Sequence, residues 1–130
     1  TTAPSGSIDR TFDLVKLATG AGATYAARGD AYHVPQTIQL IQNGIAHKGF
    51  SVIDCVSICP TYYGRKNKKG DAVKMMEWQR DNGILKARAD KMSAEELQGK
   101  MVIGCFHEDR NVPEYTEEYG KLIAKLAAKE

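Results

Sequence analysis

The 130 residues are enough for one domain, and a chain of this size buries roughly two-thirds of its unfolded surface. Hydrophobic residues make up 42% and charged residues 26%, as in an ordinary globular protein, and a net charge of +2 gives no reason to expect nucleic-acid binding. No apolar run approaches the ~20 residues of a membrane span, and the first residues lack the pattern of a signal peptide.

The N-terminal part predicts a linker, a helix and a strand. Residues 1–8 are rich in Thr, Ser, Pro and Gly and show no core pattern, which predicts a linker. Asp9 is expected to cap a helix whose apolar stripe runs from Phe12 to Ala18, and glycines end it. The apolar run 23–28 predicts a strand.

The next segment predicts a βαβ unit. Pro35 suits the first position of a second helix. The clearest strand follows over residues 50–56, between a glycine and a proline. Strand, helix and strand in this order require a parallel pair, so we expect an α/β fold with a mainly parallel sheet flanked by helices. The inner face of the second helix is expected to comprise Ile38, Leu40, Ile41, Ile45 and Ala46.

The C-terminal half predicts further helices and one strand. A long loop over residues 57–70 precedes a helix that starts at Asp71, and residues 84–91 are compatible with an extended segment. Ser93 and Glu96 match a capping box, which predicts a short helix, and residues 101–106 predict a third strand. The tail 113–130 predicts an amphipathic helix with a buried face formed by Tyr115, Tyr119, Leu122, Ile123 and Leu126.

The loop that carries Cys59 is the candidate site, because α/β proteins bind ligands beyond the carboxyl ends of their strands. It combines a Cys-Pro pair, two tyrosines and a basic cluster. Three interpretations of Cys59 stay open from the residues alone: a buried small hydrophobe, a thiolate ligand of a metal or iron–sulfur site, or a nucleophile.

The remaining cysteines and the histidines do not complete a site by spacing. Cys55 and Cys105 fall within predicted strands, where burial is the expected role. Three cysteines without a secretory signal argue against a disulfide framework and favour a reducing compartment, the cytoplasm. The histidines occupy separate segments, and His33, on a strand-to-helix loop, has the strongest case among them.

Four stretches of the chain resemble one known family. They are ATYAARGDAYHVPQTIQLI, GFSVIDCVSICPTYYGRKNKKGD, EELQGKMVIG and PEYTEEY, of which the segment CPTYYGRKNK is the most specific. The chain resembles the C-terminal half of the β subunit of 2-oxoacid:ferredoxin oxidoreductases, nearest to the 2-oxoglutarate type. The resemblance implies a partial thiamine-diphosphate-binding fold and places all 130 residues in one domain of a larger β subunit.

This resemblance implies the chemistry of the whole enzyme. Such enzymes decarboxylate a 2-oxoacid with thiamine diphosphate and Mg²⁺, form an acyl-CoA from coenzyme A, and pass electrons through a [4Fe–4S] cluster to ferredoxin. Cys59 corresponds to one of the four cluster ligands. The family's three other cluster cysteines do not occur in this sequence, and neither do its GDG…N and TGGQ segments. We therefore expect the chain alone to bind none of these cofactors and to be inactive. No residue of this chain is expected to be catalytic.

The resemblance also suggests partners. These are an α subunit, ferredoxin, and the 2-oxoacid and coenzyme A substrates, while membranes and nucleic acids are not expected. Arg65, Lys66 and Lys68 belong either to a solvated face or to a site that binds an anionic substrate, a cofactor phosphate or an acidic protein. With the resemblance, they are expected to tune the cluster or to help dock an acidic ferredoxin. Alone, the chain is expected to self-associate through apolar surface. A non-catalytic α/β interaction module and a small zinc-binding domain are the alternative functions.

Overall fold

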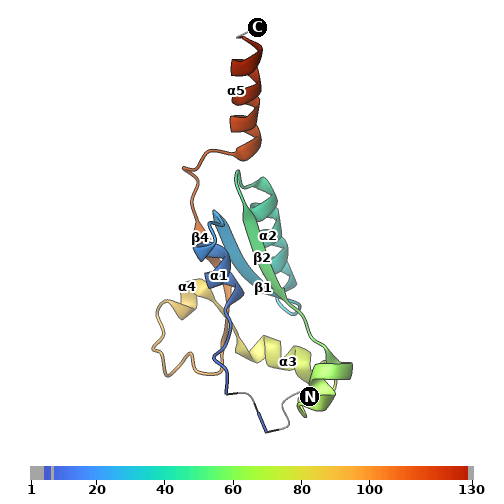
Figure 1. Ribbon diagram of the computed structural model, residues 1–130. Helices are drawn as coiled ribbons and strands as arrows, with labels where there is room; N and C mark the ends of the chain where they lie inside the picture. Colours follow the sequence, from blue (N-terminus) through green and yellow to red (C-terminus); the bar gives the residue numbers. More distant parts are fainter. Residues whose placement is uncertain (1–4, 7, 129–130) are drawn as a thin grey trace.

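The centre of the molecule is a four-stranded sheet in the order β2-β1-β4-β3. It is seen in a computed structural model that describes residues 5–6 and 8–128. β1 pairs in parallel with β2, and β3 with β4, whereas β1 and β4 are antiparallel (Figure 1). The predicted α/β class with a mainly parallel sheet is confirmed. The strands are β1 Tyr25–Asp30, β2 Ser51–Val56, β3 Gly83–Leu85 and β4 Met101–Glu108.

The strands alternate with helices along most of the chain. In the part of the chain that the structure describes, no helix is long and apolar enough to span a bilayer. The predicted linker 1–8 falls largely outside the described residues. The helices are α1 Leu14–Gly20, α2 Val34–Ala46, α3 Ala72–Asn82, α4 Lys86–Ala89 and α5 Tyr115–Ala127, with a π-helical turn, η1, over Pro60–Gly64.

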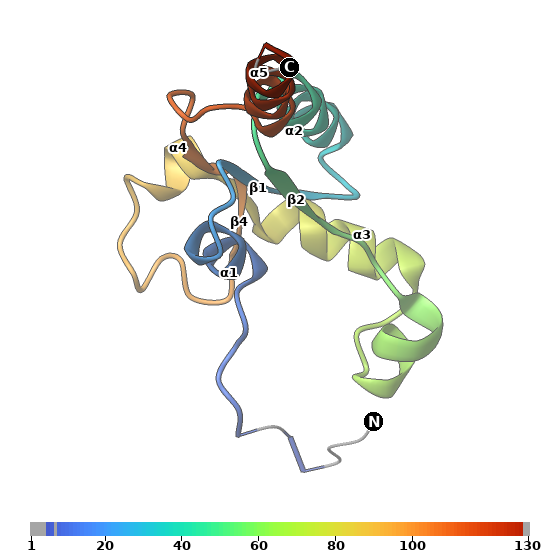
Figure 2. The same cartoon turned by 45° about the horizontal axis from the view of Figure 1, so that its top comes forward.

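Strand β1 is buried on both faces because α1 and α2 cover it from opposite sides. The Tyr25 hydroxyl donates a hydrogen bond to the Leu40 carbonyl of α2 at 3.2 Å. The Arg28 guanidinium instead reaches Asp13, the residue before α1. Tyr25 and Arg28 are an odd number of residues apart, so they point to opposite faces of the strand. Figure 2 shows α1 and α2 on opposite sides of the sheet. The core lies on the α2 side and comprises Tyr25, Ala27 and Leu40 with Ile53 and Cys105 packed against it.

A half-buried ion network joins α1 to the sheet. Arg28 Nη2 lies 2.8 Å from Asp13 Oδ1, and Arg28 Nε lies 2.8 Å from Asp54 Oδ2 of β2. The Asp13 carboxylate also accepts the backbone N–H groups of Val15 and Lys16 and so caps α1. The predicted cap at Asp9 is therefore wrong. Asp13 takes this role because its carboxylate meets Arg28 as well as the free N–H groups of the first helical turn.

The prediction for α2 is confirmed for its start and wrong for most of its inner face. Leu40 and Gly44, four residues apart, are the buried positions. Ile38, Ile41 and Ile45 are exposed, Ile45 to 80%. The stripe that contacts the sheet is narrow because α2 lies mainly over β1 and β2, with a smaller contact to β4, and the flanking isoleucines face outward.

Helix α5 stands clear of the sheet, so its predicted buried face is exposed (Figure 1). None of its residues is buried. Near its start, Glu117 forms an ion pair of 2.5 Å with Lys48, which follows α2. No surface of the described chain lies under the apolar side of this helix, which explains the difference from the prediction.

The capping box at Ser93 forms without the predicted helix. The Ser93 N–H donates to the Glu96 carboxylate at 2.7 Å, and the Glu96 N–H donates to the Ser93 hydroxyl at 3.3 Å. Residues 94–99 nevertheless form only turns. Gly99, with φ of +75°, redirects the chain toward β4 before a helix can extend.

Candidate functional site

Cys59 lies on the loop that leaves the carboxyl end of β2, and its side chain is exposed. It immediately precedes η1, the turn in which Pro60 occupies an early position that needs no N–H donor. The Gly64 N–H donates to the Cys59 carbonyl at 2.8 Å, which is the i→i+5 hydrogen bond of a π turn. Of the interpretations that the sequence left open, the buried small hydrophobe is wrong. The accessible thiol fits a ligand or a nucleophile.

The turn that follows Cys59 favours its thiolate form. Backbone hydrogen bonds from Tyr63 and Tyr62 to the sulfur lower the pKa of the Cys59 thiol. Thiolates are the form that binds metals and attacks electrophiles. Tyr63 also accepts hydrogen bonds from the Asn67 N–H at 3.0 Å and from the Asn67 side chain at 2.8 Å, which hold the loop beyond the turn.

The other two cysteines do not join Cys59. Cys55 is exposed on β2, although burial was expected, because β2 forms one edge of the sheet. Cys105 on β4 is half-buried against the core, and burial raises the pKa of its thiol. Among residues 5–6 and 8–128, no group of three or more His, Cys, Asp or Glu side chains is placed to hold a metal ion. A cluster that included Cys59 would need ligands from other polypeptide.

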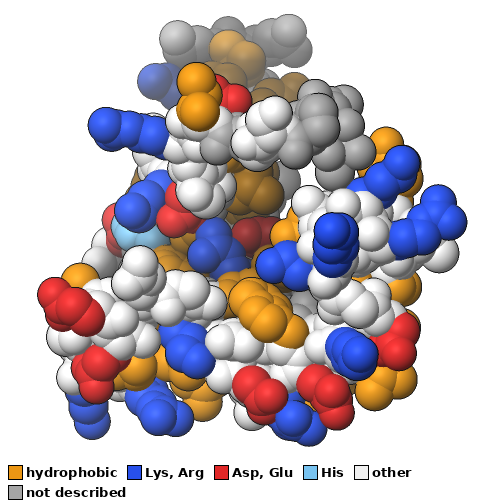
Figure 3. Space-filling model, turned by 90° about the horizontal axis from the view of Figure 1, so that it is seen from below, with side chains coloured by type: hydrophobic (Ala, Val, Ile, Leu, Met, Phe, Trp, Pro, Cys, Tyr) orange, Lys and Arg blue, Asp and Glu red, His pale blue; other side chains and the backbone are white. Residues whose placement is uncertain are grey.

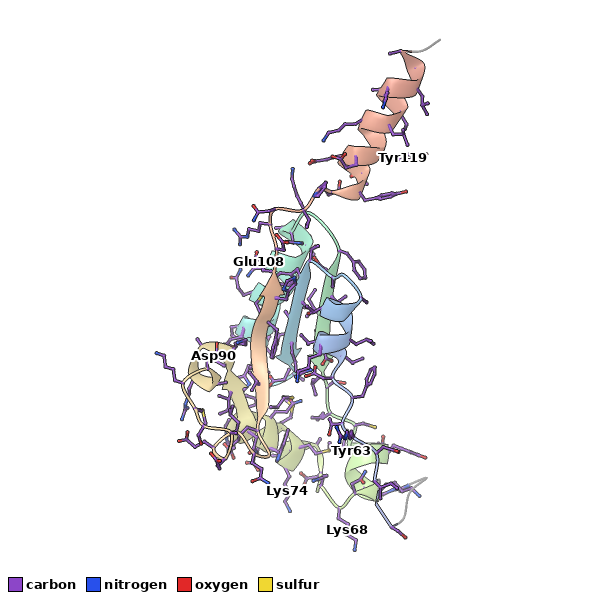
Figure 4. All side chains as sticks on the ribbon, turned by 60° about the vertical axis from the view of Figure 1, so that its left-hand side comes forward. Tyr63, Lys68, Lys74, Asp90, Glu108 and Tyr119 are labelled. Carbon is purple, nitrogen blue, oxygen red and sulfur yellow. The ribbon has the colours of Figure 1, made fainter. Side chains whose placement is uncertain are left out.

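The basic residues of the same loop face solvent. Arg65, Lys66 and Lys68 are exposed and follow η1 directly. Lys68 has a positive φ of 53° and lies at the outer end of the loop, farther from the sheet than Tyr63 (Figure 4). The loop therefore presents exposed positive charge six to nine residues along the chain from Cys59.

His33 forms a close pair with Asp30, which sequence reasoning did not single out. Asp30, at the end of β1, is 1% exposed. Its carboxylate accepts the backbone N–H groups of Tyr32 and His33 and lies 2.9 Å from His33 Nδ1. The Asp-x-x-His spacing of Asp30 and His33 in the sequence could have indicated this pair. These bonds fix the turn between β1 and α2, which accounts for both side chains structurally.

A cavity of about 510 Å³ opens beside the Cys59 loop, beyond the carboxyl end of β2. Figure 3 views this end of the molecule, where the surface is hollowed, with hydrophobic side chains inside and Lys and Arg side chains around it. Sequence reasoning missed this cavity because its walls come from four separate segments. The lining residues are Val56, Ser57, Ile58, Tyr63, Lys69, Lys74, Met75, Trp78, Gln79 and Met101.

Comparison with known proteins identifies relatives over nearly the whole chain. A 2-oxoglutarate synthase subunit KorB of Methanocaldococcus jannaschii is 49% identical over 126 residues, which are 97% of this chain and 46% of that protein. The subunit of the same name from Methanothermobacter marburgensis is 42% identical over 129 residues, 99% of this chain and 45% of that protein. This chain is homologous to 2-oxoacid:ferredoxin oxidoreductase β subunits. No family profile matches it.

A third relative, of lower sequence identity, supports the same homology. A 2-oxoacid:ferredoxin oxidoreductase β subunit of Sulfolobus sp. is 31% identical over 129 residues, covering 88% of this chain and 41% of that protein. These relatives are subunits of oxidoreductases, which confirms the resemblance seen in the sequence. The chain spans less than half the length of each of these three relatives.

Proposed function

We propose that this chain is the C-terminal part of a β subunit in a 2-oxoacid:ferredoxin oxidoreductase. The observation that carries the proposal is the 49% identity, over 97% of the chain, to a subunit named for 2-oxoglutarate synthase. The intact enzyme would convert 2-oxoglutarate or a related 2-oxoacid and coenzyme A to an acyl-CoA, with ferredoxin as electron acceptor. Nothing in the described part of the chain favours a non-catalytic interaction module or a zinc-binding domain over this function.

Cys59 is the residue of this chain that we assign to the iron–sulfur centre. Its thiol is exposed at the start of a tight turn, and hydrogen bonds to the sulfur favour the thiolate. Both properties fit one corner of a [4Fe–4S] cluster, which is bound through cysteine thiolates and carries single electrons. The other ligands, and the groups that hold thiamine diphosphate and Mg²⁺, would come from polypeptide outside these residues.

The basic loop supports a role in electron transfer to an acidic partner. Arg65, Lys66 and Lys68 are exposed on the loop that begins at Cys59. Positive charge so close to an electron-carrying centre would steer an acidic ferredoxin toward it, and such steering weakens as salt rises.

Charge reversal tests this docking surface. In the assembled enzyme, Lys66→Glu with Lys68→Glu should raise the KM for ferredoxin and flatten its dependence on salt, because the steering charge is removed. Lys91→Glu is the matched control, since Lys91 is exposed but lies on a different segment. Unchanged ferredoxin kinetics in the double variant would rule out docking at this loop.

A partner subunit is expected to cover the apolar side of α5. Its exposed large side chains would favour assembly with the α subunit in the enzyme and self-association when the chain is alone.

The direct test of the proposed function is co-expression of the complete β subunit with its α subunit. The purified complex should reduce ferredoxin only when both 2-oxoglutarate, or a related 2-oxoacid, and coenzyme A are present. Absence of any 2-oxoacid-dependent reduction would refute the proposal.

A further inference from the structure

The junction of α3 with the end of β2 leaves one buried polar atom unpaired. Gln79, on α3, is 3% exposed, and its Nε2 donates to the carbonyl of Val56, the last residue of β2, at 3.0 Å. Its Oε1 is buried and has no hydrogen-bond partner within the described part of the chain. A buried acceptor without a donor is unfavourable, so the junction suits an N–H or O–H group that enters from the cavity beside Gln79.

The apolar wall of this cavity includes side chains that remain open to solvent. Met75 and Met101 supply thioether surface, and Tyr63 and Trp78 supply two aromatic rings. Trp78 is 46% exposed and Tyr63 is 53% exposed, although large aromatic side chains gain most from burial. Aromatic residues and methionines are enriched where proteins contact one another. The cavity therefore suits a polypeptide segment that buries these side chains.

The cavity adjoins the Cys59 sulfur through Tyr63. The Tyr63 backbone N–H donates a hydrogen bond to that sulfur, and Tyr63 also lines the cavity. Residues 5–6 and 8–128 contain no group of three or more His, Cys, Asp or Glu side chains placed to hold a metal ion. A cluster at Cys59 must therefore draw its other thiolates from additional polypeptide. That polypeptide has to come against the surface on which the cavity opens.

Two lysines set the charge of the segment that fits. Lys69 and Lys74 line the same cavity, and neither forms an ion pair with any residue that the structure describes. Figure 4 shows Lys74 at the same end of the molecule as Tyr63. An ammonium group that is covered without a carboxylate partner loses hydration without compensation. The matching segment therefore carries an Asp or Glu beside its apolar residues.

We propose that this cavity receives an acidic and apolar segment of the longer β subunit, and that the same segment supplies a further cysteine ligand to the cluster at Cys59. An apolar side chain of the segment covers Trp78, one of its N–H groups donates to Gln79 Oε1, and its carboxylate pairs with Lys74. The segment then shields the cluster from water as well as completing it. This inference rests on the proposed assignment of Cys59.

Carbodiimide cross-linking of the purified complex of α and β subunits tests the contact, because it joins a lysine to a carboxylate that touches it. Lys74 should be coupled to an Asp or Glu of the β subunit that lies outside the 130 residues described above. This carboxylate should lie within about six residues of a cysteine, because six extended residues span roughly 20 Å. Replacement of that cysteine by serine should remove iron from the complex. Lys74→Arg keeps the charge but forms no stable product, so the cross-linked peptide should disappear.

Charge reversal gives a second readout. Lys74→Glu should release iron to a chelator about fivefold faster than the wild-type complex, because like charges repel the covering segment. Lys16→Glu is the matched control and should leave the rate unchanged. Lys16 holds the corresponding position in the first turn of α1, and its backbone N–H, like that of Lys74, donates to a capping aspartate.

Three cross-linking results would overturn the proposal: a Lys74 product with another subunit, a product with a β-subunit peptide that has no such cysteine, or no product. Equal iron release by Lys74→Glu and the wild type would do so as well. Cross-links are scored whether or not the complex reduces ferredoxin, so a failure of the proposed function remains distinguishable from a failure of this inference.

Discussion

Replacement of Gly64 by alanine should disturb the Cys59 turn directly. Gly64 is the buried last residue of η1. A Cβ atom there would lie 2.6 Å from Met75 Sδ, 3.3 Å from the Gly70 carbonyl oxygen and 3.5 Å from the Cys59 carbonyl oxygen. Met75 is 8% exposed and can shift only toward the cavity that it lines, at a loss of packing, and the backbone oxygen of Gly70 leaves no such room. The added methyl group therefore pushes η1 away from α3, and Cys59 immediately precedes η1.

The change in the free energy of unfolding caused by Gly64→Ala follows from two opposing effects. Overpacking of this kind destabilises by about 1–3 kcal/mol. Loss of glycine's freedom in the unfolded chain offsets roughly 0.4–1 kcal/mol of that. The net destabilisation is then about 1–2 kcal/mol. With an unfolding entropy of about 2.1 cal/mol/K for each of the 130 residues, the Tm should fall by about 4–7 °C.

Thermal unfolding and thiol alkylation measure the two consequences. Gly64→Ala should lower the Tm and slow the reaction of Cys59 with iodoacetamide, because the hydrogen bonds that favour its thiolate depend on the turn. Gly20→Ala is the matched control: no atom lies within 4 Å of a Cβ added there, so its Tm should stay within about 1 °C or rise. A Gly64→Ala protein with the Tm and Cys59 reactivity of the wild type would refute the reasoning.

Three further predictions address the thiols, the ion network and the exposed helix. At pH 7.5 Cys59 should be alkylated faster than Cys105, because hydrogen bonds lower the pKa of the first thiol and burial raises that of the second; mass spectrometry of peptides would show a reversed order if this is wrong. Burial raises the pKa of Asp13, but the hydrogen bond from Arg28 and the helix N–H groups outweigh it and lower the pKa overall. The Asp13 carboxylate should contribute fully to the free energy of unfolding above about pH 4, and this contribution should be lost as the pH falls through its lowered pKa. The Asp13→Asn variant, measured by urea unfolding, should not show this loss of stability. Leu122→Asp on α5 should reduce self-association in sedimentation velocity, whereas a monomeric wild type would contradict it.

The sequence predicted the elements whose signals are local. β2 lies between a glycine and a proline, and Pro35 and Asp71 mark the starts of α2 and α3, so these elements were placed within a residue or two. Capping by Asp13 was missed because it depends on Arg28 of β1, a contact between elements that periodicity does not reveal. The antiparallel pairing of β4 with β1 likewise depends on chain reversal over a long segment.

Burial was the least predictable property. Apolar periodicity showed that α5 has one apolar side, but whether that side is covered depends on surfaces outside the described chain. For the candidate site, Cys59 and the basic loop could be found because they are adjacent in sequence. The cavity beside them could not, because its walls come together only where α3 meets the end of β2.

Iron and sulfide analysis of the complete β subunit, purified anaerobically with its α subunit, tests the assignment of Cys59 most directly. Cys59→Ala should lose the [4Fe–4S] cluster, with its iron, its sulfide and its reduced paramagnetic signal, because the substitution removes the one ligand that we assign to this chain. Cys105→Ala, which removes a half-buried thiol on β4, should keep the cluster. Full iron and sulfide content in the Cys59→Ala subunit would contradict the account.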